Sequence, residues 1–199
     1  MSDVIPLRPG PSAQARTSAL SDEGLARACG AGDPAAIGEL FDRFQPRVTR
    51  YLRRLLPDDA VEDALQAVFL EVARGTAVFD GRAAVSTWLF AIATNVARHE
   101  RRSFARRSRL GSALSTLPPR GSAEVDRLTA RDELARAHAA LRGLSPPLRE
   151  AFVLCELEGL AAAEAAKVLR TSEAAVWKRV SKARRAIRER VLGRKGGRR

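Results

Sequence analysis

The chain has 199 residues, enough for one ordinary domain or two small ones, and its hydrophobic fraction of 45% excludes wholesale disorder. No apolar run is long enough to span a membrane, and the first twenty residues lack the apolar core of a signal peptide, so we expect no direct membrane insertion and a cytoplasmic location. The net charge of +12 favours a polyanionic partner.

The basic residues are concentrated in two stretches. Residues 98–109 hold six arginines against one glutamate, and residues 178–199 hold eleven lysines and arginines against one glutamate. The rest of the chain is slightly acidic. Two separate basic patches predict that the polyanion is contacted at two places.

Helical periodicity follows a lead over residues 1–20, which is rich in proline and is expected to be disordered. Proline or an acidic first turn after a capping residue marks the expected helix starts. In the first half of the chain these starts are Ser21-Asp22-Glu23, Asp33-Pro34, Pro57-Asp58-Asp59 and Ser86. Pro46 lies inside the second of these helices and should kink or split it.

A second helical unit follows a flexible basic linker, which we place at residues 106–122. Its expected helices begin near Ala123, at Ser145-Pro146, at Leu160 and at Ser172. The predicted fold class is therefore all-α, with two small helical domains over residues 21–105 and 123–192 and a basic tail over residues 193–199.

The last two predicted helices have the spacing of a helix-turn-helix, with a turn at Arg170-Thr171 and Ser172 as the N-cap of the second helix. One side of that last helix is apolar. The opposite side carries Ala174, Lys178, Ser181, Lys182 and Arg185. Small side chains allow approach to a major groove and basic ones bind phosphate, which favours DNA binding over a merely solvated face. Trp177 lies on the flank, where core burial and DNA contact are both open.

Two helices of the amino-terminal unit carry a polar or charged face in addition to their apolar face. Residues 60–74 present Glu62, Asp63 and Gln66 on one side, which suits a basic protein partner, although a solvated face is the simpler interpretation of the pattern alone. In the helix from Ser86, Trp88 and its apolar neighbours are expected in the core, and the arginine-rich end is expected to bind nucleic acid.

These segments resemble bacterial sigma factors of the extracytoplasmic-function class. EDALQAVF is similar to that class's EDLVQEVF, and WLFAIATNVA, followed by Arg101-Arg102, is similar to WLYRIARNLA. LREAFVLCELEGL and VWKRVSKAR resemble a second block, REVFVLRxxEGL and VKSRLxRAR. The two blocks occur in the family's order and cover residues 35–105 and 130–192.

The resemblance implies a protein that binds core RNA polymerase and directs it to promoter DNA. It assigns contact with the polymerase to Glu62, Asp63, Gln66 and Phe69, of which Phe69 is expected in the core. It assigns the melted minus-ten strand to Phe79, Asp80, Arg82, Ser86, Asn95, Arg98, Arg101 and Arg102. It assigns the minus-thirty-five element to Ser172, Ala174, Ala175, Lys178, Arg179, Ser181, Lys182 and Arg185. Members of this class are commonly held off by an anti-sigma protein, which is therefore a candidate partner.

The chain departs from the family motifs at several positions. Ala161, Ala165 and Arg170 replace a capping hydroxyl, a large aliphatic residue and a glycine. The lost cap and the smaller core residue should each loosen the helix-turn-helix by about 1 kcal/mol or more. Ala91 and Thr94 replace two arginines. Strand capture should then depend more on the arginines that follow.

Two other classes of function remain as alternatives. A stand-alone helix-turn-helix regulator would need a dimer interface or an effector pocket. An enzyme would need clustered carboxylates or a nucleophile constellation, yet His99 and His138 lie in different units without a metal-ligand pattern. We expect no catalysis, no cofactor, no metal and no small-molecule substrate. Cys29 and Cys155 are expected as small buried residues in a reduced cytosol.

Overall fold

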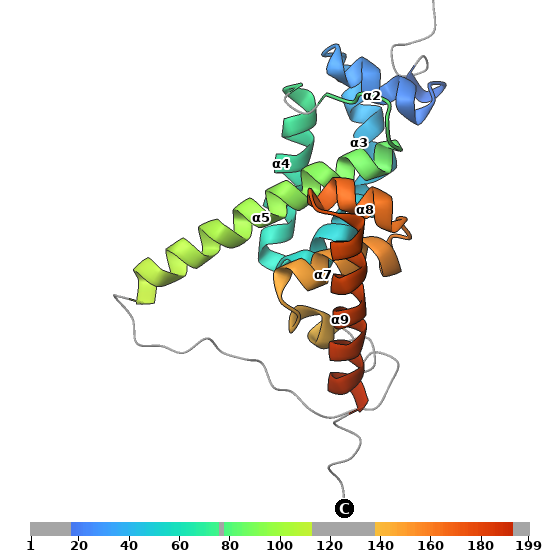
Figure 1. The fold of residues 1–199 in the computed structure, drawn as a ribbon. Helices are drawn as coiled ribbons and strands as arrows, with labels where there is room; N and C mark the ends of the chain where they lie inside the picture. Colours follow the sequence, from blue (N-terminus) through green and yellow to red (C-terminus); the bar gives the residue numbers. More distant parts are fainter. Residues whose placement is uncertain (1–16, 76–77, 113–137, 193–199) are drawn as a thin grey trace, which may run out of the picture.

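A computed structural model describes residues 17–75, 78–112 and 138–192. These residues are almost entirely helical and contain no strand, as the sequence predicted. The helices α2 to α5 pack together; α7 lies against α3, and α8 crosses α5 (Figure 1). α9 packs on α7 and α8. The two helical units therefore form one body rather than two separated ones.

The first two helices begin at the predicted caps. α2 spans Asp22–Gly30, and the Ser21 side chain accepts a hydrogen bond from the Gly24 N–H at 3.1 Å. α3 spans Pro34–Leu55, and the Asp33 carboxylate accepts from the Ala35 N–H at 2.9 Å. Each cap supplies an acceptor for an N–H group that the helix cannot satisfy by itself.

Pro46 was predicted to kink or split the second helix, and the structure contradicts the split. α3 continues through Pro46 as one helix. Pro46 is exposed, so water can reach the carbonyl that loses its helical partner, while Phe44 and Val48 remain buried on either side. The apolar face of α3 outweighs the single missing hydrogen bond.

The rest of the amino-terminal unit consists of a short 3-10 turn, η1 (Asp58–Ala60), then α4 (Val61–Ala73) and α5 (Val85–Ser112). α5 is longer than the sequence predicts: the helix continues to Ser112, through the first seven residues of the predicted linker, which begins at residue 106. The end of α5 extends away from the other helices (Figure 1).

The carboxy-terminal unit contains α7 (Pro146–Phe152), a π-helical turn η2 (Val153–Leu157), α8 (Ala162–Leu169) and α9 (Glu173–Leu192). The starts at Ser145-Pro146 and Ser172 are as predicted, and the short helix starts within two residues of Leu160. Most of the helix expected from Ala123, the rest of the linker, the lead and the tail lie outside the described residues.

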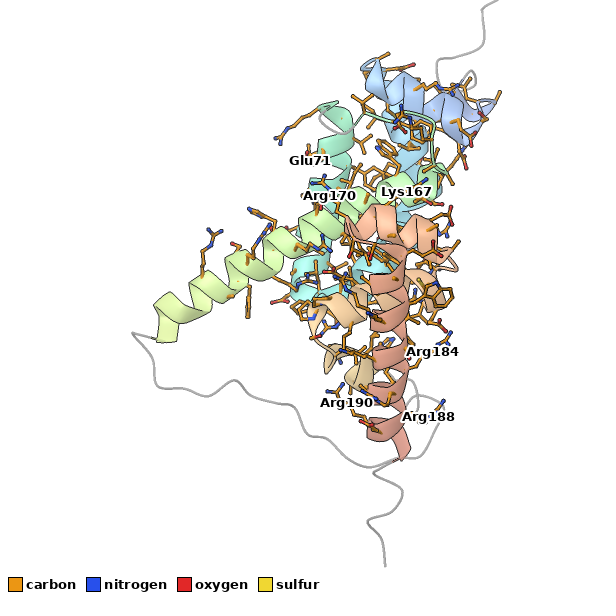
Figure 2. All side chains as sticks on the ribbon, viewed as in Figure 1. Glu71, Lys167, Arg170, Arg184, Arg188 and Arg190 are labelled. Carbon is orange, nitrogen blue, oxygen red and sulfur yellow. The ribbon has the colours of Figure 1, made fainter. Side chains whose placement is uncertain are left out.

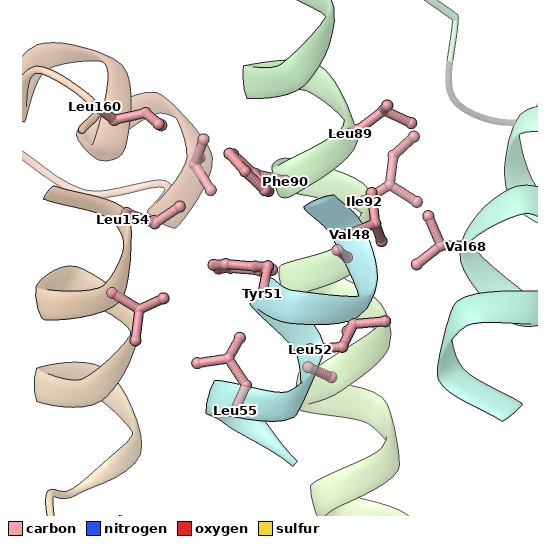
Figure 3. Packing of buried hydrophobic residues seen from close by; sticks show 14 of the residues in the cluster. Val48, Tyr51, Leu52, Leu55, Val68, Leu89, Phe90, Ile92, Leu154 and Leu160 are labelled. Atoms are coloured by element: carbon pink, nitrogen blue, oxygen red, sulfur yellow. The ribbon is translucent and has the colours of Figure 1, made fainter. Parts of the chain in front are cut away.

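One hydrophobic core extends through both units. Tyr51 of α3 and Phe90 of α5 lie at its centre, with ring centroids 4.7 Å apart. Figure 3 shows Leu154 and Leu160 of the carboxy-terminal unit facing these two rings. The units are therefore joined by buried apolar surface as well as by polar contacts.

Candidate polymerase and nucleic-acid interfaces

The acidic face of α4 is open to solvent. Glu62, Asp63 and Gln66 are exposed, whereas Phe69 is buried with its ring edge-on to Phe41 at 4.8 Å between centroids. Leu70, one turn beyond Gln66, is 50% exposed and adds an apolar element that the sequence reasoning missed. This face can therefore contact one partner through carboxylates, an amide group and an apolar side chain.

A groove of about 180 Å³ separates the start of α4 from α5. Asp63 and Arg101 line it together with Phe104, whose side chain is 58% exposed. The sequence does not single out Phe104, because it lies next to the predicted linker, where no apolar periodicity marks it. The continuation of the helix through this segment brings it next to the α4 face.

The loop before α5 is held by its own contacts. Asp80 accepts a hydrogen bond from the Arg82 N–H at 3.0 Å, and Gly81 between them has a positive φ of 75°. Phe79 is buried, with its ring 5.5 Å from that of Trp88, while Asp80 and Arg82 are exposed. The Phe79 ring therefore packs against Trp88 in the interior and is not exposed to solvent.

The basic end of α5 does not face solvent as a whole. Asn95 and Arg102 are exposed, and Ser86 is half-buried in the first turn. Arg98, by contrast, donates to one carboxylate oxygen of Glu150 in α7, from Nε at 3.1 Å and from Nη2 at 2.7 Å. Arg101 donates to the other oxygen of the same carboxylate. Two of the predicted strand-binding arginines are therefore occupied by the carboxy-terminal unit.

A second cluster of this kind was not foreseen from the sequence. The Glu158 carboxylate, only 3% exposed, binds Arg47 and Arg54 of α3, with Arg47 Nε at 3.3 Å. The Arg47 guanidinium also lies over the Phe90 ring, 5.0 Å from its centroid. Buried carboxylates require such partners, but α3 and Glu158 are about a hundred residues apart in sequence.

The two positions at which the family motif has arginines are packed in this chain. Thr94 is fully buried; its hydroxyl donates to the Phe90 carbonyl at 2.6 Å and is 2.7 Å from the Tyr51 hydroxyl. Ala91 is partly buried against the core. In this structure the two small residues serve packing.

The helix-turn-helix is present, and the structure puts its predicted DNA-reading side chains mostly in solvent. The Ser172 hydroxyl accepts from the Ala175 N–H at 3.2 Å, which caps α9 as predicted. Val176, Val180 and Ala183 form the buried side of α9. The exposed predicted residues are Ser172, Ala174, Lys178, Ser181, Lys182 and Arg185, with Ala175 and Arg179 half-buried. Trp177 is 55% exposed and so is not a core residue.

The turn before α9 is unusual. Arg170 has a φ of 52°, and the Thr171 N–H binds the Ala166 carbonyl at 3.0 Å, which closes α8. Lys167 and Arg170 lie where α8 crosses α5 (Figure 2). At the other end of α8, the Glu164 carboxylate accepts from the Ala161 N–H at 3.0 Å, so half of a capping box remains despite the missing hydroxyl.

Comparison with known proteins agrees with this arrangement. The family models for Sigma-70 region 2 and Sigma-70 region 4 match residues 40–107 and 134–187. The sigma factor NccH of Alcaligenes xylosoxydans xylosoxydans is 32% identical over 82% of this chain and 90% of its own length. CarQ of Myxococcus xanthus, also an RNA polymerase sigma factor, is 36% identical over 64% of this chain and 73% of its own.

The chain belongs to the extracytoplasmic-function sigma factors. The sigma-E factor of Escherichia coli K12 is a further relative of this class, 28% identical over 86% of the chain. Among solved structures, CnrH in complex with the cytosolic domain of CnrY aligns with 86% of this sigma factor and 97% of that chain, at 28% identity and a TM-score of 0.64. The sigma factor RpoE of Bartonella quintana, in complex with the anti-sigma factor NepR, shares the fold at 22% identity and a TM-score of 0.65, over 76% of this chain and 94% of its own.

The two cysteines of this sigma factor carry free thiols. Cys29 is buried, and desolvation raises the pKa of its thiol to about 11. Burial also raises the pKa of Cys155. Both thiols are therefore protonated at neutral pH. Cys29 is buried as predicted, whereas Cys155 is only half-buried. Among the described residues no group of acidic, histidine or cysteine side chains is arranged to bind a metal, and no helix is long and apolar enough to cross a membrane.

Proposed function

We propose that this sigma factor divides promoter recognition between its two units. The exposed face of α4 docks on core RNA polymerase, α5 with its preceding loop holds the melted minus-ten strand, and α9 reads the minus-thirty-five duplex. The protein catalyses no bond formation itself. It acts in the cytoplasm and associates with the nucleoid when active.

The observation that carries this proposal is the two-sided build of α9. Its apolar side is buried, while small residues at its start and Lys178, Lys182 and Arg185 further along are exposed. Small side chains let a helix approach base edges, and lysines and arginines one or two turns away are placed to bind phosphates. The tight turn packs α8 against α9, which is the arrangement of a DNA-binding helix-turn-helix and is not required for a helix with a solvated charged face.

The minus-ten assignment is supported by an amide beside cationic side chains. Asn95 can form hydrogen bonds with a base edge, and Arg102 is exposed for phosphate contact. Arg98 and Arg101 would join them once released from Glu150. Because Phe79 is buried, strand capture in this chain rests on these polar groups more than on that ring.

An anti-sigma protein is proposed as a further partner. CnrH and RpoE, whose folds this chain shares, were both solved in complex with a second protein, the cytosolic domain of CnrY and the anti-sigma factor NepR. The alternative, a stand-alone helix-turn-helix regulator, is not favoured, because the chain carries both sigma regions in order.

Run-off transcription with core RNA polymerase on a promoter library tests the proposal directly. We expect transcripts from a subset of promoters, and no transcript without this chain. If every promoter stays silent without a second factor, the proposed activity is wrong.

A polymerase pull-down tests the α4 assignment. Asp63→Arg combined with Gln66→Ala should reduce capture of core polymerase at least tenfold, because it reverses the charge at the centre of the exposed face. Glu23→Arg, which reverses an exposed carboxylate on α2, serves as the matched control and should leave capture unchanged. Equal capture of polymerase by wild type, the double variant and the control would show that α4 is not part of the interface.

A further inference from the structure

We infer that Trp177 reads the minus-thirty-five duplex by packing its indole ring against a thymine methyl group. The inference rests on the proposed role of α9 in binding that duplex, and it adds one specificity-determining side chain to the residues assigned there. The thymine methyl is the apolar group that a base pair presents in the major groove. The contact therefore favours thymine at one position of the element.

The exposure of Trp177 is the first support. Trp177 is 55% exposed, whereas Val176 and Val180 on the same helix are buried. No described residue stacks on its ring. Trp88, by contrast, packs against the core and contacts the Phe79 ring. Tryptophan is enriched at binding surfaces, because it brings a large apolar area at a low cost in conformational entropy.

The neighbours of Trp177 along α9 give the second support. Ala174 lies three residues before it and Ser181 four residues after it, so both flank it on the helix surface, and both are exposed. Because these two side chains are small, the indole projects beyond them toward any surface that α9 approaches. Trp177 is the fifth residue of α9, within the first turns, which are the part of a recognition helix that reaches base edges.

The charges around Trp177 favour a nucleic acid as the partner of this ring. Lys178 and Lys182 are exposed on one side of it. Positions 177, 181, 184 and 188 recur at steps of four and three, so Arg184 and Arg188 project from the side of α9 that carries the indole (Figure 2). Cations on both sides can bind phosphates while the ring between them reaches into the groove.

The sequence departs from the family motif at this position. In VKSRLxRAR a lysine stands at the position of Trp177 and a serine at the position of Lys178. An indole cannot bind a phosphate as a lysine does, so the exchange replaces a charged contact with an apolar one. This chain should therefore have a base preference that chains with the lysine lack.

Run-off transcription by holoenzyme tests the inference on promoters randomised across the minus-thirty-five element. Core RNA polymerase is loaded with wild type, with Trp177→Lys or with Leu157→Ala. Leu157, which is 42% exposed and lies outside α9, is the matched apolar control. We expect thymine to be enriched at one position among the transcripts of wild type and control, and this enrichment to disappear with Trp177→Lys. Absence of an enriched thymine in wild type, or its persistence in Trp177→Lys, would overturn the inference.

Removal of the methyl group tests the contact from the DNA side. Deoxyuridine replaces the enriched thymine in a promoter fragment, and holoenzyme binding is measured by anisotropy. We expect the replacement to weaken binding of wild type and of Trp177→Phe about fourfold, the value of one buried methyl group, and to leave binding of Trp177→Ala unchanged. An equal loss for Trp177→Ala and wild type would contradict the inference, because the methyl group would then act without the ring. Circular dichroism should show equal helix content for all variants, since position 177 is exposed.

Failure of the proposed function would look different. If wild-type holoenzyme transcribes no library promoter, or transcribes regardless of the minus-thirty-five sequence, the proposed role of α9 fails and this inference fails with it. If transcription depends on that element but not on a thymine that Trp177 recognises, only the inference fails. A Trp177→Ala variant that lowers transcription by the same factor at every promoter would show a contact with polymerase and would also contradict the inference alone.

Discussion

Arg170 stores strain at the centre of the helix-turn-helix. It has a left-handed backbone conformation, with φ of 52°, and is the one described non-glycine residue with positive φ. α2 closes with the same pattern of hydrogen bonds, but there Gly32 occupies the left-handed position, with φ of 81°. A side chain in this conformation costs roughly 1 kcal/mol or more relative to glycine, because Cβ crowds the backbone.

Arg170→Gly should therefore stabilise the protein. We expect the free energy of unfolding to rise by about 1 kcal/mol and Tm to rise by roughly 2–4 °C in thermal melts. Arg50→Gly, at an exposed right-handed position inside α3, is the opposite control and should destabilise by about 1 kcal/mol. A fall in Tm for Arg170→Gly would show that the arginine side chain makes a compensating contact.

At the scale of single helices, sequence patterns predicted most of what the structure contains. The caps at Ser21, Asp33 and Ser172 and the stripe of α9 depend on residues within one or two turns, so local chemistry decides them. The end of α5 is not predicted, because its serine, glycine and arginine residues have the composition of a flexible linker. Alanine and arginine are good helix formers, and the helix continues to Ser112.

α9 also yields a prediction on salt dependence. Lys178→Ala should weaken binding to the minus-thirty-five duplex evenly across sequences and reduce the salt slope by about 1, because one phosphate contact is lost. Titrations at several salt concentrations measure the slope. Arg53→Ala, an exposed cation on α3 in the other unit, should leave the slope unchanged. An unchanged salt slope for Lys178→Ala would show that Lys178 does not contact a DNA phosphate.

At the scale of the whole molecule, the position of one unit on the other could not be predicted. Glu150 contacts arginines about fifty residues away, and Glu158 contacts arginines more than a hundred residues away. Hydrophobic periodicity does not indicate which distant residues form ion pairs. A glutamate that is buried against arginines of another unit has the same local sequence as one that is exposed to solvent. The basic end of α5 was accordingly predicted as free surface, although two of its arginines are paired.

The shared core predicts a single unfolding transition. Calorimetry of wild type should show one peak with equal calorimetric and van't Hoff enthalpies, because buried side chains of both units belong to one cluster. Reversing both carboxylates, Glu150→Arg with Glu158→Arg, should place like charges together and split the peak in two, whereas Glu156→Gln should keep one. Two peaks in wild type would mean that the units unfold independently.

Arg98 and Arg101 are paired with Glu150, and we propose that they also bind promoter DNA. On that proposal, the affinity for the promoter depends on the fraction of free molecules in which these pairs are open. If only one free molecule in a hundred is open, the apparent affinity for DNA falls about a hundredfold, which corresponds to roughly 2.7 kcal/mol. Core polymerase that binds only the open form would remove this loss of DNA affinity before the chain contacts the promoter. The same closed population would keep unassembled sigma factor from occupying promoters by itself, so that commitment to a gene begins with the enzyme rather than with the DNA.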